Sequence, residues 1–232
     1  AALFVATPIF SHNNIPMNIK ASMAFFFTIV FYPSMPSLVI AINVPTIVIA
    51  ILSELMLGLF VGIVLQLAYN VITLAGGLIS FMMGFSMASA IDPQSGVSMP
   101  IISQFLSLIS LMILLSLNLH HWMLLFIDNT LKTVPLGGFL INEDMFNYTW
   151  HATSNMFLVG FMIAFPIIAL SLLQDVIFGM LMKTMPQFNL LVIGFPIKIM
   201  VAFAVLIATI TATTLIVKGQ MQEAFNILEI LF

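Results

Sequence analysis

Hydrophobic positions along this chain form long segments that charged residues rarely interrupt. Several intervals between neighbouring charges exceed the ~20 residues that a membrane-spanning helix needs. These intervals are bounded by Lys20 and Glu54, Glu54 and Asp92, Asp92 and Asp128, and Asp144 and Asp175. Between Lys198 and Lys218 lies one further apolar candidate, residues 199–217. The pattern predicts a protein built from membrane-length helices.

Proline and glycine divide these segments into predicted helices. Pro33 should end the first helix, Gly76-Gly77 should loosen the second, and Pro166 should kink a later one. We expect helices over residues 17–31, 45–74, 78–87, 100–128, 144–183 and 197–232. The predicted fold class is all-α, a single hydrophobic, membrane-associated domain over residues 1–232 that consists of helical hairpins with broken helices. Because the chain begins at Ala1 rather than Met, we also expect the N-terminal helix to be cut short.

Composition separates this chain from soluble domains. Of its 232 residues, 62% are hydrophobic and 6% are charged, against roughly 25% charged in a typical soluble domain. A bilayer, or burial inside an oligomer, must cover so much apolar surface. Five lysines, no arginine and a net charge of −3 exclude nucleic-acid binding, because phosphate backbones require a basic surface. Lys132 and Lys183 flank the same hydrophobic segment at opposite ends, so lysine placement predicts no orientation.

One predicted helix carries small and polar residues at a spacing of four. This spacing places them on one slowly winding face of the helix; the residues of this stripe are Glu54, Gly58, Gly62, Gln66 and Asn70. A Gly-x-x-x-Gly pair lets another helix approach closely, and a buried amide finds hydrogen-bond partners across such an interface. The stripe therefore predicts helix packing, against either a neighbouring subunit or another helix of the same chain.

Two carboxylates lie inside or at the edge of long apolar runs, where an ionised group is costly unless it is paired or hydrated. For Glu54, a helix N-terminus or a solvated mouth is favoured over a proton relay. For Asp175, pairing with Lys183 or with a group on another subunit is favoured over transport chemistry.

Metal-binding and redox motifs are not evident in the sequence. His120 and His121 are adjacent, so on a helix their side chains point about 100° apart and cannot chelate one ion together. Beside Trp122 they are typical of anchoring at a membrane interface. The chain has no cysteine. We expect no metal site, no cofactor and no enzymatic activity.

Two segments rich in glycine, proline and polar residues resemble a known family. The first runs from Gly84 to Gly96 and is followed by Met99-Pro100. The second, residues 185–198, follows the pattern APQxNxxxxGFPxK, with Met185 in place of the leading Ala and with these residues in register: Pro186, Gln187, Asn189, Gly194, Phe195, Pro196 and Lys198. Both segments resemble those of the flagellar biosynthesis family FliR, and the similarity covers essentially the whole chain.

The resemblance implies a single-copy subunit of the flagellar type III protein export gate in the bacterial inner membrane, within the flagellar basal body. It implies assembly with FliP-like and FliQ-like subunits and contact with an FlhB-like subunit. Unfolded flagellar proteins would pass through the channel, and sister subunits together with membrane lipid would cover much of this chain in a helical hetero-oligomer.

The resemblance also implies that the loop with the Asp-Pro turn plugs the channel. The occluding side chains would be Phe85, Met87, Ile91 and Met99, and the backbone would be set by Asp92, Pro93 and Gly96. No covalent chemistry is needed, because an apolar loop can close a pore by dewetting it.

Three alternatives remain beside this interpretation. A homologous subunit of a virulence type III secretion system would share the same segments. A secondary transporter would also use interrupted helices and intramembrane carboxylates, but it should show two related halves, and we detect none. An intramembrane serine protease would need Ser86 with His121 or His151, yet no oxyanion or His-helix pattern follows Ser86.

Overall fold

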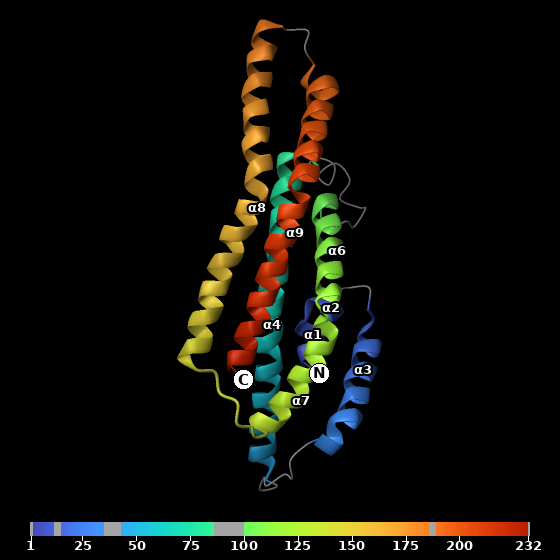
Figure 1. Cartoon of the computed structure of the whole chain (residues 1–232), viewed down its shortest axis with the longest axis vertical. Helices are drawn as coiled ribbons and strands as arrows, with labels where there is room; N and C mark the ends of the chain where they lie inside the picture. Colours follow the sequence, from blue (N-terminus) through green and yellow to red (C-terminus); the bar gives the residue numbers. More distant parts are fainter. Residues whose placement is uncertain (1, 12–14, 35–42, 86–99, 186–188, 232) are drawn as a thin grey trace. The chain divides into compact units, whose positions relative to one another are not determined.

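The computed structural model describes residues 2–11, 15–34, 43–85, 100–185 and 189–231. Within these ranges every regular element is a helix (Figure 1), which confirms the all-α prediction. The α-helices are α1 (Ala2–Ala6), α2 (Pro8–Ser11), α3 (Met17–Phe31), α4 (Val44–Met82), α6 (Ile101–Ser116), α7 (Leu119–Thr133), α8 (Glu143–Thr184) and α9 (Phe195–Leu231). A short 3₁₀-helix, Tyr32–Ser34, follows α3, and a π-helix, Leu190–Gly194, leads into α9.

Three helices of the described part are long and apolar enough to cross a membrane. They are Val44–Met82, Glu143–Thr184 and Val192–Leu231. The pair α6 and α7 adds a fourth candidate if it is counted as one span, although the two helices are bent by 57° at their junction. The membrane-length helices predicted after Asp144 and after Lys198 are therefore present, as α8 and α9, whereas the interval between Lys20 and Glu54 contains α3, which at 15 residues is shorter than a candidate span.

Helix α4 corrects one sequence prediction. The helices expected over 45–74 and 78–87 are a single element that continues through Gly76-Gly77 to Met82. The reason lies in packing, because a Cβ atom added to Gly76 would lie only 2.5 Å from Cα of Ser103 on α6. Gly76 permits the close approach of α6 rather than a break in α4.

The helix predicted over residues 100–128 is also different, because it is divided in two. It ends at Ser116, and α7 begins at Leu119 after Asn118, whose φ of 57° lies in the left-handed region. Asparagine tolerates this conformation better than most residues. The helices predicted over 17–31 and 144–183 match α3 and α8 closely, and α8 continues through Pro166.

Contacts group the chain into two compact units. Unit 1 contains Ala1–Tyr69, Leu111–Thr153 and Gly219–Phe232, and unit 2 contains Asn70–Ser110 and Ser154–Lys218. The core of unit 1 is aliphatic and sulfur-rich, with these fully buried side chains: Val61, Leu65, Leu114, Leu119, Met123, Met221 and Leu228. The core of unit 2 is similar, with these: Ile72, Ile79, Met83, Leu106 and Ile167.

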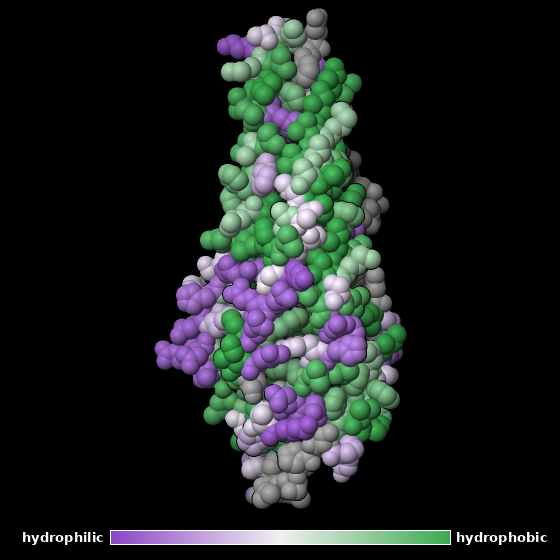
Figure 2. All heavy atoms as spheres, viewed as in Figure 1, coloured by the Kyte–Doolittle hydropathy of each residue, from purple (hydrophilic) through white to green (hydrophobic). Residues whose placement is uncertain are grey.

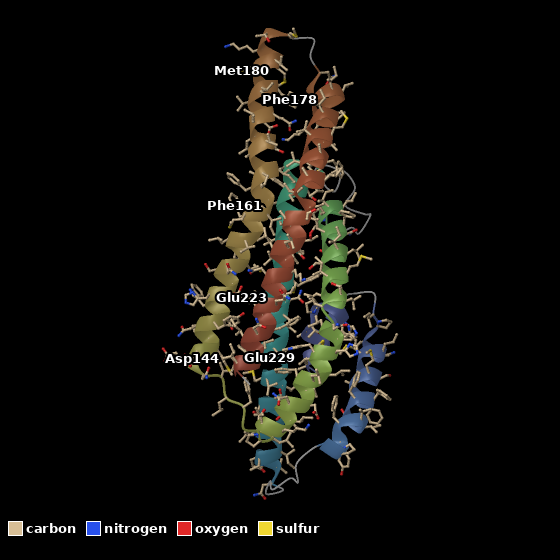
Figure 3. All side chains as sticks on the ribbon, viewed as in Figure 1. Asp144, Phe161, Phe178, Met180, Glu223 and Glu229 are labelled. Atoms are coloured by element: carbon tan, nitrogen blue, oxygen red, sulfur yellow. The ribbon has the colours of Figure 1, made fainter. Side chains whose placement is uncertain are left out.

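Aromatic stacking joins α7 to α9 within unit 1. The ring of Trp122 stacks on Phe126 at 5.1 Å between centroids and on Phe225 at 4.8 Å. The indole N–H donates a 2.7 Å hydrogen bond to the carboxylate of Glu229, a residue labelled on α9 in Figure 3. Trp122 therefore has a packing role inside the chain, whereas its sequence neighbourhood indicated an interfacial anchor.

Apolar side chains make up much of the surface (Figure 2), and on the face shown the hydrophilic ones gather beside the first turns of α8. Within unit 2, α8 exposes Phe161 and Met180 but buries Phe178, all three labelled in Figure 3. Val192–Leu231, which contains α9, is a candidate span on the basis of an apolar window of 18 residues, and only 17% of that window is buried inside the chain. Lipid or other protein must cover this helix, because water would not stabilise so much apolar surface.

Candidate functional site

The predicted plug segment begins at the C-terminal end of α4. Of its residues, Phe85 is described, whereas these lie outside the described residues: Met87, Ile91, Asp92, Pro93, Gly96 and Met99. The start of the segment has a defined geometry, because α4 ends in a Schellman motif. The N–H of Phe85 donates to the carbonyl oxygen of Ser80 at 3.1 Å, and the N–H of Gly84 donates to that of Phe81 at 3.1 Å.

Gly84, the residue immediately before the plug segment, lies against the second family-like segment. Its φ of 83° is in the left-handed region, which glycine adopts without the cost that a Cβ imposes. A Cβ at Gly84 would lie 2.9 Å from Cε1 of Phe195. Within unit 2, the structure thus brings together two sequence segments that are about 110 residues apart, and each was singled out separately in the sequence.

The family-like segment connects α8 to α9. Pro186 and Gln187 lie outside the described residues. Asn189 precedes the π-helix and caps it: its side-chain Oδ1 accepts from the N–H of Val192 at 3.3 Å, and its carbonyl oxygen accepts from the N–H of Ile193 at 3.0 Å. Gly194 is buried and Pro196 is exposed. The α-helical pattern is interrupted here, as the sequence predicted, and π-helical turns are frequent at functional sites.

Lys198 forms an ion pair between α9 and α8. Its Nζ atom donates to both carboxylate oxygens of Asp175, at 2.7 and 2.8 Å. The lysine side chain is 11% exposed and the aspartate side chain is 51% exposed. The sequence predicted that Asp175 is paired, but it offered Lys183 or a group on another subunit as the partner, and the partner is instead Lys198 of the same chain. Lys183 follows Asp175 on the same helix, whereas the chain turns back after Thr184 and brings Lys198 into contact.

The small-and-polar stripe of α4 packs within the chain where its glycines lie. A Cβ at Gly62 would overlap with Cβ of Ala6, and one at Gly58 would lie 3.0 Å from that of Ala2. The partner helix is therefore α1, which corresponds to the intrachain alternative. Gln66 and Asn70, further along the stripe, are partly buried and make contacts of their own.

Glu54, the first residue of the stripe, binds the turn before α8. Its Oε1 atom accepts a 3.2 Å hydrogen bond from the N–H of Gly137. Gly137 has a φ of 78°, and the N–H of its neighbour Gly138 donates to the carbonyl oxygen of Pro135 at 2.8 Å, which closes a tight turn. Glu54 is the eleventh residue of α4, so the prediction that it lies at a helix N-terminus is wrong.

Groups of three or more histidine or acidic residues that could hold a metal ion are absent from the described residues.

Comparison with known proteins supports the resemblance found in the two family-like segments. Residues 1–224 match the family described as bacterial export proteins, family 1. The flagellar biosynthetic protein FliR of Escherichia coli (strain K12) is 30% identical over 231 residues, covering 98% of this chain and 87% of that protein. The protein of the same name from Bacillus subtilis (strain 168) is 32% identical over 225 residues, covering 94% and 86%. The chain belongs to the FliR family of bacterial export proteins.

Sequence reasoning missed two contacts in this FliR-family chain. The ion pair between Asp175 and Lys198 was missed because it depends on the path of the chain after α8. The contact between Gly84 and Phe195 was missed because glycine gives no hydrophobic signal. Each residue stood in a family-like segment, but nothing in the sequence indicated that the two segments are in contact.

Proposed function

We propose that this FliR-family chain is a subunit of the flagellar type III protein export gate in the bacterial inner membrane, within the flagellar basal body. It forms part of the channel wall, and residues 85–99 plug the channel until an unfolded flagellar protein enters. Its partners are FliP-like and FliQ-like subunits, with an FlhB-like subunit in contact. A virulence secretion system is a weaker alternative, because the relatives named above are flagellar proteins.

The contact between Gly84 and Phe195 carries this proposal. A plug must move, but its base must stay fixed for the plug to return to the same position. The Schellman motif and the ring of Phe195 provide a fixed base, because both hold the chain immediately before the segment begins. Phe85, partly buried, is then the first apolar side chain that the base presents.

The sparse burial around α9 supports a shared assembly. A chain that spans a bilayer alone would expose this surface to lipid, whereas a subunit of an export gate would cover much of it with neighbouring helices. Association of helices in a membrane depends on close packing at small residues, and Gly77 of α4 and Gly179 of α8 have no atom of this chain within 4 Å of the position that a Cβ would take.

The plug is tested by the conductance of the assembled gate. Replacing Met87 and Ile91 with alanine should increase the passage of small ions, because the substitution removes apolar volume from the seal. The matched control is the double variant Met180→Ala with Val176→Ala, which alters exposed residues of α8 outside the segment. An unchanged leak in the Met87 and Ile91 variant would refute the plug assignment.

The subunit assignment is tested by purification from membranes. A tag on this chain should recover FliP-like and FliQ-like subunits in a defined complex. Recovery of the chain as a monomer that takes up a small solute would instead favour a secondary transporter.

A further inference from the structure

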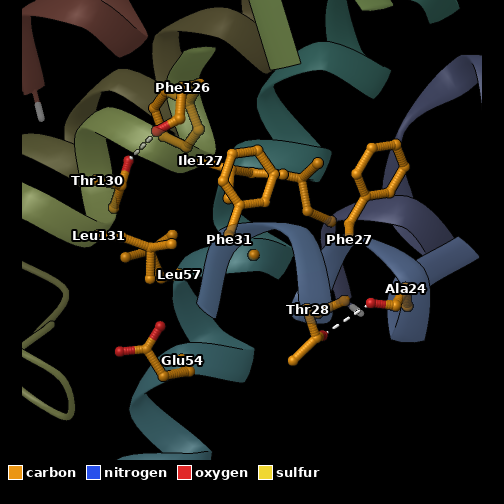
Figure 4. Close-up of a pocket in the computed structure, with 13 residues that line it drawn as sticks. Ala24, Phe27, Thr28, Phe31, Glu54, Leu57, Phe126, Ile127, Thr130 and Leu131 are labelled. Atoms are coloured by element: carbon orange, nitrogen blue, oxygen red, sulfur yellow. Dashed lines mark hydrogen bonds between the residues drawn. The ribbon is translucent and has the colours of Figure 1, made fainter. Parts of the chain in front are cut away.

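A pocket of about 200 Å³ lies within unit 1, between α1, α3, α4 and α7 (Figure 4). Its walls are largely apolar and include Leu3, Phe27, Leu57, Phe126 and Leu131. Two threonines also line it, but each hydroxyl already donates to a backbone carbonyl one turn earlier, Thr28 to Ala24 and Thr130 to Phe126. Glu54 is the one charged residue among the described residues that line this pocket.

The carboxylate of Glu54 is incompletely compensated in this setting. The hydrogen bond from Gly137 comes from a neutral amide, and a carboxylate near apolar walls is better stabilised by a cation. All five lysines lie in the described part of the chain. The ion pairs found there join Lys132 to Asp128 and Lys198 to Asp175, and neither includes Glu54. Within the described residues no lysine pairs with Glu54, so a cation that balances its charge would come from outside these residues.

We propose that this pocket binds the side chain of a lysine presented by a neighbouring protein subunit. The ammonium group would pair with Glu54, and the methylene stem would lie against Leu57, Phe126 and Leu131. Lysine suits such a site because its stem is apolar and its charge is compact. An apolar cavity of about 150 Å³ can hold benzene, so the pocket has room for four methylenes and an ammonium.

The helix that forms one wall supports an occupant from outside. None of the residues of α3 is fully buried, although Phe27 and Phe31 face the pocket. A bound side chain would cover these rings. An aminophospholipid is less suitable, because its phosphate would lie near Glu54 and no basic residue lines the pocket to balance it. This inference rests on the proposed function, since it needs a neighbouring subunit.

The test is a zero-length crosslink in membranes that contain the assembled gate. A water-soluble carbodiimide joins a carboxylate to a touching amine as an amide, with the loss of one water that the carbodiimide takes up to become a urea. Mass spectrometry of the peptides should find Glu54 joined to a lysine of another subunit. Glu54→Gln should abolish this product, whereas Glu143→Gln, an exposed acid at the start of α8, should leave it unchanged.

A variant that fills the pocket provides a second measurement. Ala24→Leu adds three carbon atoms to the pocket wall while leaving Glu54 in place, and it should reduce the crosslink at least tenfold. Linkage of Glu54 to Lys20 of the same chain, to a lipid amine, or to nothing would overturn the inference. Purification of the gate without crosslinker separates the failure of this inference from the failure of the proposed function. If the chain copurifies with export subunits but the Glu54 crosslink is not found in the carbodiimide experiment, only the lysine-binding inference is refuted. If the chain copurifies with no export subunit, the proposed function is refuted.

Discussion

Lys198 on α9 and Asp175 on α8 form an ion pair whose two ends differ in their access to solvent. The ammonium donates to both carboxylate oxygens, at 2.7 and 2.8 Å. The lysine side chain is nearly buried at 11% exposure, whereas half of the aspartate side chain is accessible. Loss of the aspartate would leave a buried charge unpaired, but loss of the lysine would leave a carboxylate that solvent can reach.

This asymmetry predicts unequal effects of two substitutions. Asp175→Asn should lower the free energy of unfolding of the gate by about 1–3 kcal/mol, because it removes a charge-assisted bond from a buried ammonium. Lys198→Met should cost less, about 1 kcal/mol or under, because methionine keeps most of the apolar stem. Both should reduce the amount of assembled gate. Thermal inactivation of the purified complex measures the difference.

Lys183→Met is the control for this pair, since Lys183 lies in the last turn of α8 and belongs to neither ion pair of the described residues. It should leave the inactivation temperature nearly unchanged. A larger loss in Lys198→Met than in Asp175→Asn would show that the burial of the lysine charge is not the controlling factor.

Adjacent glycines of α4 give a second prediction. Gly76→Ala should destabilise the protein, because its Cβ would lie 2.5 Å from the backbone of Ser103 and α6 would have to move. Gly77 has no atom within 4 Å of the corresponding position. Gly77→Ala should therefore stabilise the helix by roughly 0.5–1 kcal/mol, the gain from glycine to alanine in a helix interior. Opposite changes in inactivation temperature would support this account, and equal changes would contradict it.

Some helix bounds could be predicted from the sequence, and others could not. The bounds of α3, Met17–Phe31, could be predicted because proline follows shortly after the helix and apolar residues fill it. Gly76 was misread as a break because a glycine signals either flexibility or close approach, and only the neighbouring helix distinguishes them. The division at Asn118 was hidden because a left-handed residue within an apolar run leaves no trace in its hydrophobic pattern.

The candidate sites were predictable to a similar extent. The stripe from Glu54 to Asn70 correctly indicated helix packing for its glycines, but spacing alone could not choose α1 over another subunit. Asp175 was correctly expected to need a partner. The partner itself depended on the turn between α8 and α9, and tertiary contacts of this kind are not encoded in local periodicity.

Trp122 supports a third prediction, because it is packed between two rings while the other tryptophan, Trp150, is 70% exposed. Trp122→Ala should lower the free energy of unfolding by about 3–5 kcal/mol, the usual cost of removing a large packed aromatic side chain. Trp122→Phe should cost less, since it preserves stacking and loses the 2.7 Å bond to Glu229.

Trp150→Phe is the matched control, and it should change stability by less than about 0.5 kcal/mol, as is usual at exposed positions. It also leaves Trp122 as the sole tryptophan, which can be excited selectively over the three tyrosines. Its emission should then shift to longer wavelength when the protein unfolds. If Trp122→Ala unfolds at the same temperature as Trp150→Phe, the stack does not stabilise unit 1.

The last prediction concerns the base of the proposed plug. Gly84→Ala should destabilise the assembled gate by about 1–2 kcal/mol, because a residue with a Cβ is disfavoured at a φ of 83°, and the new methyl group would also press on the ring of Phe195. Gly179→Ala, a substitution within α8 that meets no atom within 4 Å, should not destabilise it.

In a Phe195→Ala background the steric part of the cost of Gly84→Ala disappears and the backbone part remains. Gly84→Ala should therefore cost less there than in the parent chain, but more than zero. Thermal inactivation of the four proteins of this cycle, read beside their ion leak, tests both parts. An equal cost in both backgrounds would mean that Phe195 does not hold the base, and no cost in the variant background would mean that the left-handed turn is not required.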